Sequence, residues 1–313
     1  MKGISIIIPT YNRERFIRET IQSVIDQEYD GKIEIIISDD GSTDNTLQIA
    51  RSFGDKVIIL EKKKDCKDQG ASATRNRGLK VATQPYIAFL DSDDLYLPRH
   101  LKKMGRFLEQ NENVDYVFCR SLQVKTENGK TLFKAWTHKK LTKKEIEYPA
   151  ISGSNIVNTN CFVFRKKIFD VVGVFDVNYP NSEDSDMWIR IGEHFSGIFL
   201  DHYGVAYRID HGEDQLTGAE KRVISEYYKK VNAAAIERYY QQGLKDPYRI
   251  LLLKIRRSNL NNQRRKYIHY INCLFLIFKY PTGFIQMIPS LWLRLFSRKK
   301  ENDWKEFSYF IGS

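Results

Sequence analysis

Three carboxylates lie within four positions of one another at the end of a strongly apolar run. They are Asp91, Asp93 and Asp94, in the stretch YIAFLDSDDLYLP of residues 86–98. Like charges this close raise one another's pKa unless a positive group lies among them. Carboxylate oxygens suit hard divalent cations, and Mg²⁺ typically takes one or two from the protein and the rest of its ligands from substrate phosphates and water. The stretch therefore favours a divalent cation that carries a diphosphate.

The same acids have a plainer alternative as helix caps. Asp94 or Ser92 could cap the helix that is predicted to begin near Pro98, because hydroxyls and carboxylates favour the positive end of a helix dipole. This alternative accounts better for Asp94 than for the three acids together.

A second acidic cluster, DDGSTD at residues 39–44, follows another apolar run. Gly41 and Ser42 are typical turn residues, and an acid could cap the next helix. A turn does not explain why the run ends in two acids. We expect Asp40 to lie in a cleft and to accept a hydrogen bond from the imide group of a nucleobase.

A third stretch, GASATRNRGL at residues 70–79, combines small residues with Arg75 and Arg77. A planar guanidinium group can stack on a base or bind phosphate oxygens, which would place Arg75 beside a nucleotide. The alternative is an ordinary helix with solvated arginines.

These polar clusters follow strands that alternate with helices, a pattern that predicts a parallel sheet covered on both faces. Ser42 or Thr43 is expected to cap the second helix, and Pro98 is expected in the first turn of the helix after the acidic triplet. In such sheets ligands bind beyond the carboxyl ends of the strands. The polar signatures PTYN, DDGS and DSDD would therefore share one edge of the sheet. The predicted strands and helices of this part are residues 4–12, 13–27, 32–42, 43–53, 56–62, 71–82, 85–94, 98–111 and 114–124.

The composition allows a large core and indicates a reducing compartment. The chain has 313 residues, of which 42% are apolar, enough for one large α/β domain with an appendage or for two domains. Its four cysteines are far apart and form no CxxC pair, so neither a zinc site nor a disulfide framework is expected. No signal peptide is visible at the N-terminus.

Positive charge is concentrated in the last part of the chain. Residues 221–313 contain 19 Lys or Arg and 6 Asp or Glu, whereas residues 1–220 contain 31 and 33. This asymmetry suggests a basic tail that meets an anionic surface. Nucleic acid is disfavoured as the partner, because no recognition motif accompanies the charge.

The tail also alternates basic clusters with aromatic residues. Its apolar stretches, residues 271–278 and 284–296, are shorter than the roughly 20 residues of a membrane-spanning helix. Short amphipathic helices with Trp292, Phe296 and flanking Lys or Arg suit the membrane interface. The alternative is a helical cap on the body of the protein with a solvated basic face.

Four stretches in order, SIIIPTYNRERFIRETIQSVIDQ, IIISDDGSTDNT, GASATRNRGL and YIAFLDSDDLYLP, resemble the family 2 inverting glycosyltransferases of the GT-A fold. The resemblance extends to about residue 212. It implies a GT-A type, mostly parallel Rossmann-like sheet between helices, and a divalent cofactor, Mn²⁺ or Mg²⁺. The implied nucleotide-binding residues are Pro9, Thr10, Tyr11 (against the uracil), Asn12, Asp40, Arg75, Asp91 and Ser92, and the implied metal ligand is Asp93.

In the family, an acid pair followed by an apolar helix and an arginine contains the catalytic base. Glu183 and Asp184 with Arg190 fit this pattern, and by position Asp184 is the base. A carboxylate within hydrogen-bond reach can take the proton of an acceptor hydroxyl. Trp188 and Arg190 lie on the same predicted helix, where core packing and a structural ion pair are the alternative. His211 is a further candidate ligand of the metal or the diphosphate.

The sequence therefore predicts a catalytic domain over residues 1–215, with a nucleotide-binding half (1–100) and an acceptor half (101–215). A basic helical region follows over residues 216–313. The expected activity is metal-dependent, inverting transfer of one sugar, from a nucleotide sugar that we expect to be a UDP-sugar, to a lipid-linked glycan at the cytoplasmic face of the membrane. Processive relatives have a QxxRW motif and transmembrane helices, which this sequence lacks. The alternatives are a sugar nucleotidyltransferase, although PTYNRERF contains no glycine, and a non-catalytic nucleotide-sugar-binding protein.

Overall fold

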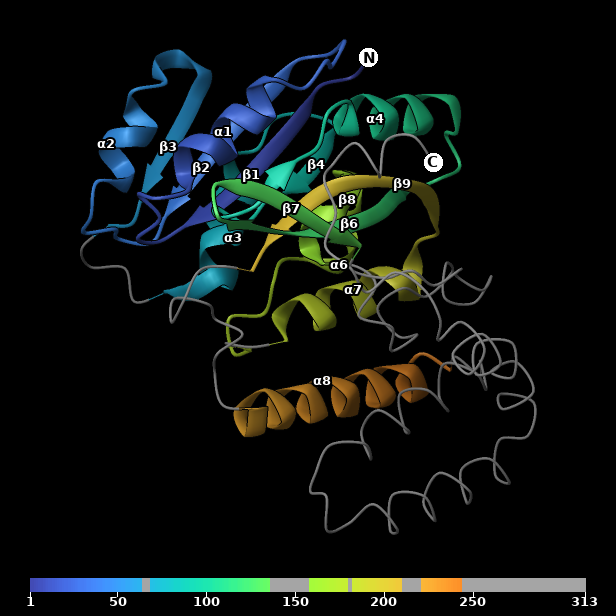
Figure 1. The fold of residues 1–313 in the computed structure, drawn as a ribbon. Helices are drawn as coiled ribbons and strands as arrows, with labels where there is room; N and C mark the ends of the chain where they lie inside the picture. The colour runs from blue at the N-terminus through green and yellow to red at the C-terminus, as the bar shows by residue number, and fades with distance from the viewer. Residues whose placement is uncertain (64–67, 136–157, 180–181, 210–220, 244–313) are drawn as a thin grey trace.

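The computed structural model describes residues 1–63, 68–135, 158–179, 182–209 and 221–243 (Figure 1). The strands are β1 (Ile4–Thr10), β2 (Ile33–Asp39), β3 (Val57–Glu61), β4 (Tyr86–Phe89), β5 (Leu95–Tyr96), β6 (Tyr116–Glu127), β7 (Lys130–Ala135), β8 (Phe162–Arg165) and β9 (Gly197–Arg208). The helices are α1 (Ile17–Ile25), α2 (Thr46–Arg51), α3 (Gly70–Val81), α4 (His100–Gln110), α6 (Lys167–Val172), α7 (Glu183–His194) and α8 (Lys221–Gln241), with 3₁₀ turns η1 (Gly54–Lys56) and η2 (Thr159–Cys161).

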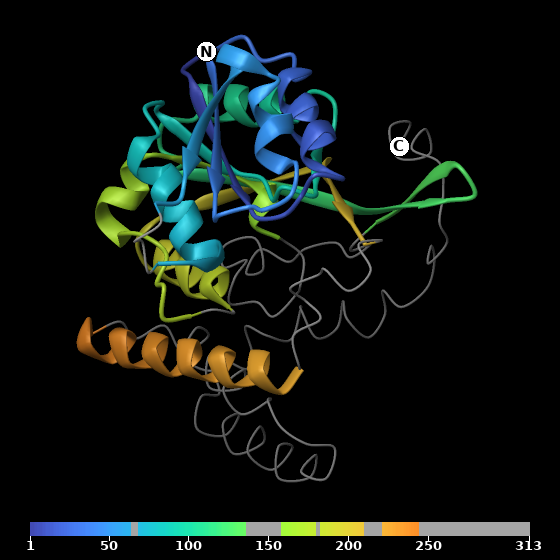
Figure 2. The same ribbon diagram turned by 90° about the vertical axis from the view of Figure 1, so that its left-hand side faces the viewer.

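One sheet of strand order β3-β2-β1-β4-β8-β6-β9-β5 organises the molecule, and β7 pairs with β6 at its side. Strands β1 to β4 are parallel to one another, as the alternation of strands and helices predicts. The later strands continue the sheet with antiparallel pairs β4–β8, β6–β8 and β5–β9 and the parallel pair β6–β9. The predicted α/β fold, a sheet between helices, is confirmed. Figure 2 shows the β6–β7 hairpin projecting from the body.

Hydrophobic side chains pack on both faces of the sheet. Along β1, alternation sends Ile4, Ile6 and Ile8 to the face covered by α1, α2 and α4, and Ile7 to the face covered by α3, α6 and α7. All four isoleucines are fully buried, and each such side chain contributes about 1.5–3 kcal/mol relative to exposure. The sheet is therefore a rigid base for the loops at its edge.

The predicted cap of the second helix is wrong. Helix α2 begins at Thr46, and the Thr46 backbone N–H donates to Asp44 Oδ1 at 3.0 Å. Ser42 and Thr43 instead bind the loop that follows β1: Asn12 N–H donates to Ser42 Oγ at 2.9 Å, and Thr43 N–H donates to Asn12 Oδ1 at 2.8 Å. The Ser and Thr that look like caps join two loops.

The helix after the acidic triplet also begins later than predicted. Helix α4 starts at His100, so that Pro98 precedes it, and its N-cap residue Arg99 makes no side-chain capping bond. Asp94 and Ser92 are therefore not its caps. Asp94 is completely buried and binds elsewhere.

Helix α8 confirms the helix predicted at the start of the C-terminal region, and it lies against α7 (Figures 1 and 2). Arg238 of α8 pairs with Asp186 at 3.6 Å and with Glu193 at 3.4 Å, and both acids belong to α7. Within the described part of the chain, no helix has the length and apolar character needed to cross a bilayer. His211, Trp292 and Phe296 lie outside the described residues.

Candidate active site

The acidic triplet forms a tight turn directly after β4. The Asp94 backbone N–H donates to Asp91 O at 3.0 Å and closes the turn. Asn160 of η2 supports it from behind, accepting from Asp91 N–H at 2.9 Å through Oδ1 and donating to Asp94 Oδ2 at 2.5 Å through Nδ2. The turn thus places Asp91 and Asp93 at the edge of the sheet, where their side chains are 30% and 18% exposed.

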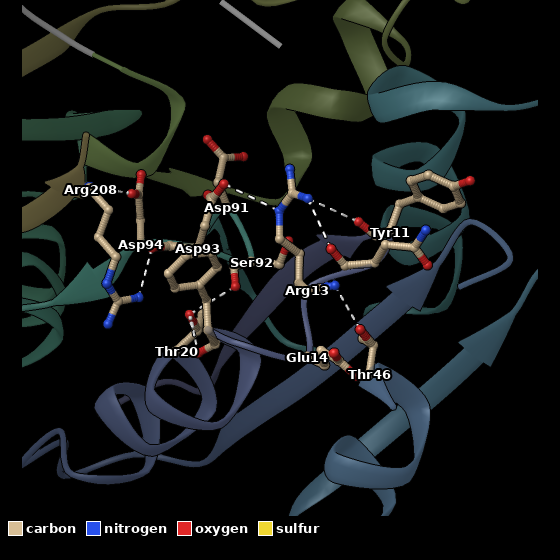
Figure 3. A network of polar contacts seen from close by, with 12 residues as sticks. Tyr11, Arg13, Glu14, Thr20, Thr46, Asp91, Ser92, Asp93, Asp94 and Arg208 are labelled. Carbon is tan, nitrogen blue, oxygen red and sulfur yellow. Dashed lines mark hydrogen bonds and ion pairs between the residues drawn. The ribbon is translucent and has the colours of Figure 1, made fainter. Parts of the chain in front are cut away.

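Arginines from separate elements provide positive charge beside this turn. Arg13 Nε, from the loop after β1, lies 3.3 Å from Asp93 Oδ2, and Arg75 Nη2, from α3, lies 2.9 Å from Asp91 Oδ1. Figure 3 shows the turn between Arg13 and Arg208. Arginine is thus part of the positive charge that the spacing of the carboxylates requires.

Asp94 has a different role from its two neighbours. Its Oδ1 accepts from the Arg208 backbone N–H at 2.9 Å and its Oδ2 accepts from Asn160. Burial raises the pKa of the Asp94 carboxyl well above its usual range, and the charges of Asp93 and Asp91 raise it further. Asp94 therefore holds the turn to β9 and is not available as a metal ligand.

Arg208 completes this support from the end of β9. Its Nη1 donates to Asp93 O at 2.7 Å, its guanidinium group pairs with Glu19 of α1, and it lies 5.3 Å from the centre of the Phe16 ring. Sequence reasoning missed Arg208 and Asn160 because neither lies in a motif with its partners. Arg13 lies within the PTYNR stretch and was the one additional residue that the sequence could have suggested.

Arg75 connects the carboxylate turn to the predicted base. It is 6% exposed, and its Nη1 lies 2.8 Å from Glu183 Oε1 while its Nη2 binds Asp91. Burial and the charge of Asp184 raise the pKa of Glu183 to about 7, although Arg75 lowers it. The alternative of a solvated Arg75 is wrong. The structure brings Asp91, Arg75 and the Glu183–Asp184 pair into one chain of contacts.

Asp184 lies in the first turn of α7, next to Glu183. Its side chain is half-buried, and its Oδ1 accepts from the Ser185 backbone N–H at 2.6 Å. Trp188 packs in the core, stacked on Phe162 with ring centres 4.7 Å apart. Arg190 pairs with Asp186 at 2.8 Å. For Trp188 and Arg190 the structural alternative is correct, and they fix the helix that holds Asp184.

The loop after β1 is tied to the DDGSTD loop. Thr10 is buried, while Tyr11, with 53% of its surface exposed, projects at the edge of the sheet after Pro9. Asn12 takes a left-handed conformation with φ of 49° and makes the two bonds to Ser42 and Thr43 described above. The exposed Tyr11 ring is available to a flat ligand such as a nucleobase.

Asp39 and Asp40 have separate functions. Asp39 is 1% exposed and its Oδ2 accepts from the backbone N–H groups of Gly41 and Ser42 at 2.7 and 2.9 Å, so it builds the turn. Asp40 accepts from Gly70 N–H at 2.7 Å and lies 2.9 Å from Arg77 Nη2. These two contacts give Asp40 a structural role. A hydrogen bond from a nucleobase to Asp40 stays a prediction.

The family model described as glycosyl transferase family 2 matches residues 5–173. An uncharacterized glycosyltransferase of Rickettsia prowazekii is 28% identical over 202 residues, which are 64% of this chain and 61% of the relative. The chain thus spans about three fifths of that relative's length. The UDP-Glc:alpha-D-GlcNAc-diphosphoundecaprenol beta-1,3-glucosyltransferase WfaP of Escherichia coli is 34% identical over 61% of this chain and 70% of its own.

Solved structures share the fold at low sequence identity. TarS 1–349 of S. aureus in complex with UDP-GlcNAc has a TM-score of 0.55 at 16% identity, covering 91% of this chain and 92% of its own. The mannosyltransferase PcManGT of Pyrobaculum calidifontis, in complex with GDP-Man and Mn2+, has a TM-score of 0.55 at 16% identity, covering 95% and 88%. These similarities concern the fold.

The raised pKa of Glu183 predicts a change in stability with pH. A carboxyl group that holds its proton more tightly in the folded protein favours folding at low pH, and this contribution is lost as the pH rises from about 4.5 to about 7. Glu183→Gln removes the titration. We expect its melting temperature, relative to the unchanged protein, to be higher at about pH 8 than at about pH 5.5.

Glu34→Gln is the matched control for this experiment. Glu34 is also buried, but hydrogen bonds from Ser5 and Thr83 outweigh the effect of burial and lower its pKa. Its contribution is lost only below its ordinary pKa of about 4.5, so its difference from the unchanged protein should stay constant between about pH 5.5 and pH 8. A constant difference for Glu183→Gln as well would contradict the assignment of a neutral titration to Glu183.

Proposed function

Because the chain belongs to glycosyl transferase family 2, we propose that it transfers one sugar from a nucleotide-sugar donor to a hydroxyl group of an acceptor glycan, with inversion at the anomeric carbon. One observation carries this proposal: Arg75 joins Asp91 of the carboxylate turn to Glu183, the neighbour of Asp184. A turn suited to a diphosphate and a half-buried carboxylate suited to proton transfer thus belong to one network. Such a transfer needs both.

The residues of the turn fit a divalent cation. Asp91 and Asp93 are partly exposed carboxylates two positions apart in one turn, the oxygen donors that Mg²⁺ and Mn²⁺ accept. A diphosphate would bring further negative charge to a turn that already holds the carboxyl groups of Asp91 and Asp93, so it needs additional positive charge. When bound, the cation would offset the charge that grows on the departing diphosphate. Asp93 is its proposed main ligand, and His211 stays a candidate.

The proposed donor site lies along the carboxyl ends of β1, β2 and β4. Its first part is formed by Pro9 and Thr10 at the end of β1 and by Tyr11 and Asn12 of the loop that follows, with Tyr11 against the nucleobase. Asp40 and Arg75 contact the nucleotide, and Asp91 and Ser92 line the ribose and the diphosphate. Arg75 touches Asp91 in the structure, so we expect it to act through that carboxylate as well as on the ligand.

Asp184 is the proposed general base. An acceptor hydroxyl attacks the anomeric carbon as the bond to the diphosphate oxygen breaks, and its proton passes to the Asp184 carboxylate. Attack from the face opposite the leaving diphosphate inverts the anomeric centre. Glu183 binds Arg75 and so has a positioning role beside the base.

The relatives support a proposal for the substrates. TarS binds UDP-GlcNAc, PcManGT binds GDP-Man with Mn2+, and WfaP uses UDP-Glc with a diphosphoundecaprenol acceptor. We propose a UDP-sugar donor and a lipid-linked glycan acceptor for this chain, in cell-surface polysaccharide synthesis at the cytoplasmic face of the membrane. Thermal stabilisation by a panel of nucleotide sugars, with and without Mn²⁺, would identify the donor.

Two other functions remain to be separated from this one. A sugar nucleotidyltransferase would consume a nucleoside triphosphate and a sugar phosphate, and a binding protein would release no product. Release of UDP from a UDP-sugar only when a glycan acceptor is present distinguishes the proposed transfer from both.

Asp93→Asn tests the metal ligand. The substitution preserves shape but removes the charge, so we expect turnover to fall by at least about 10²-fold, the scale of losing a main electrostatic stabiliser. The melting temperature should change little, and EDTA should inactivate the unchanged protein. Asp30→Asn, which removes an exposed acid paired with Arg106, is the control and should keep full activity. Full activity of the unchanged protein in EDTA would exclude the metal assignment.

Asp184→Asn tests the base. The lost interaction belongs to the transition state, so kcat should fall by about 10²–10⁴-fold while the Kd of the UDP-sugar, measured by calorimetry, stays within about twofold. A donor affinity that collapses together with the rate would mean that Asp184 has a structural role.

The basic tail, residues 221–313, leads to a prediction about the membrane. Each Lys or Arg near an anionic surface contributes about 1 kcal/mol, an attraction that salt screens, while buried Trp292 and Phe296 would add a part that salt does not remove. We expect the full chain to cosediment with vesicles containing anionic lipid and to be released only partly by high salt. A chain ending at residue 262 should lose this binding and still bind nucleotide. Equal cosedimentation of both would contradict membrane anchoring by the tail.

A further inference from the structure

Three potential metal ligands meet in a part of the molecule that the proposed transfer does not use. They are His100 at the start of α4, Cys119 on β6 and His202 on β9. The distance from His100 Nδ1 to His202 Nε2 is 3.4 Å, and that from Cys119 Sγ to His100 Nδ1 is 3.8 Å. One ligand atom from each residue lies within 4.8 Å of the other two.

These distances suit the edges of a tetrahedron around one ion. Zinc binds histidine nitrogen at about 2.0–2.1 Å and cysteine sulfur at about 2.3 Å, which gives N–N edges of about 3.3–3.4 Å and N–S edges of about 3.6 Å. A hydrogen bond between the two imidazole nitrogens at 3.4 Å would be a long one. The two nitrogens are thus separated as two ligands of one ion are.

The pairing of β6 with β9 is irregular beside these residues, and this irregularity brings the three side chains together. The pairing of β6 with β9 shifts register between Phe118 and Arg120: Phe118 pairs with Phe199 and Arg120 with Tyr203, so that β9 has extra residues, His202 among them, opposite the single residue Cys119. Such bulges re-aim side chains and are frequent beside functional sites. At Gly204 of β9, a Cβ atom would collide with His100 Nδ1 and approach Cys119 Sγ to 2.7 Å, so a glycine is needed for the three groups to meet.

Both histidines are in the protonation state that can bind a metal cation. Burial lowers the pKa of His100 well below its usual range and that of His202 to about 4, so both rings are neutral at neutral pH and keep a lone pair. A hydrogen bond to the Leu200 backbone orients the His202 ring, the kind of contact that fixes metal-binding histidines. Burial raises the pKa of the Cys119 thiol, which would lose its proton on binding a metal.

We propose that His100, Cys119 and His202 form a binding site for a borderline-soft transition-metal ion of the Zn²⁺ class. Its nitrogen and sulfur ligands set it apart from the oxygen ligands of the carboxylate turn, so Mg²⁺ does not compete for it. The sequence predicts no zinc site, because its cysteines lack a paired spacing. The fold overrides that expectation by joining residues that are 19 and 102 positions apart. The proposal does not depend on the proposed transfer reaction.

The ion would join the two segments that hold the carboxylate turn. His100 follows the turn in the chain, and His202 precedes Arg208, whose backbone binds Asp94. The two segments already touch, since Leu97 N–H donates to Gly204 O at 2.9 Å. Bound metal would therefore stiffen the support of the turn without contacting the donor.

Titration of the metal-free full-length protein with Co²⁺ tests the proposal. We expect one Co²⁺ per chain to give the intense visible bands of tetrahedral cobalt together with a thiolate-to-cobalt charge-transfer band. Zn²⁺ should displace the Co²⁺ and raise the melting temperature, because a ligand that binds only the folded state stabilises it. Cys119→Ser should abolish the charge-transfer band, and His202→Gln should weaken binding at least about tenfold, the scale seen when a metal site loses one supporting contact.

Two matched controls keep the test specific. His194→Gln replaces a histidine of α7 outside the cluster, and Asp93→Asn alters the carboxylate turn; both variants should keep the cobalt spectrum. Melting curves without metal establish that each variant folds, and the half-buried His202 provides the second variant if Cys119→Ser does not fold. Absence of the charge-transfer band in the unchanged protein, or its persistence in Cys119→Ser, would overturn the proposal.

Discussion

Compensation of the negative charge after β4 is the constraint on which the arrangement of the site depends. Two partly exposed carboxylates and one buried carboxyl lie in a single turn, and they can do so only because positive and hydrogen-bonding groups reach them from elsewhere. Arg13 comes from the loop after β1, Arg75 from α3 and Arg208 from β9. The turn therefore keeps its shape only if β1, α3 and β9 are all in place. Its geometry is a property of the whole sheet.

The position of α3 illustrates how close packing serves this charge balance. A Cβ atom at Gly78 would collide with Ile7 of β1, so the glycine lets the helix lie directly on the sheet. Arg75 lies one turn earlier on the same helix and points to both Asp91 and Glu183. A buried ion pair of this kind contributes little net stability, whereas removal of one partner costs about 3–5 kcal/mol. Its value to the molecule is that it fixes the spacing between the turn and the start of α7.

The sequence predicts the first half of the fold well because the two patterns that specify it lie within short stretches of the chain. Apolar strands alternate with amphipathic helices, and polar residues follow each strand end, so the shared edge follows from parallel pairing alone. The antiparallel strands of the second half could not be predicted in the same way, since nothing local specifies that β8 lies between β4 and β6. Asn160 and Arg208 could not be predicted for the same reason, since their partners lie 66 to 189 positions away.

One predicted cap and one capping alternative are both wrong because the polar residues have partners across the fold. Ser42 and Thr43 have the chemistry of helix caps, and so does Asp94. Each of them instead binds a residue from another part of the fold. Ser42 and Thr43 bind Asn12, and Asp94 binds Asn160 and Arg208. A cap contributes about 0.5–2 kcal/mol, whereas a buried carboxyl left unpaired costs more than a cap provides. For the buried Asp94 the need for partners prevails over capping, whereas the partly buried Ser42 and the exposed Thr43 are held at the sheet edge by their bonds to Asn12. A polar residue after a strand in this fold is therefore better interpreted as a bond between loops at the sheet edge than as the start of the next helix.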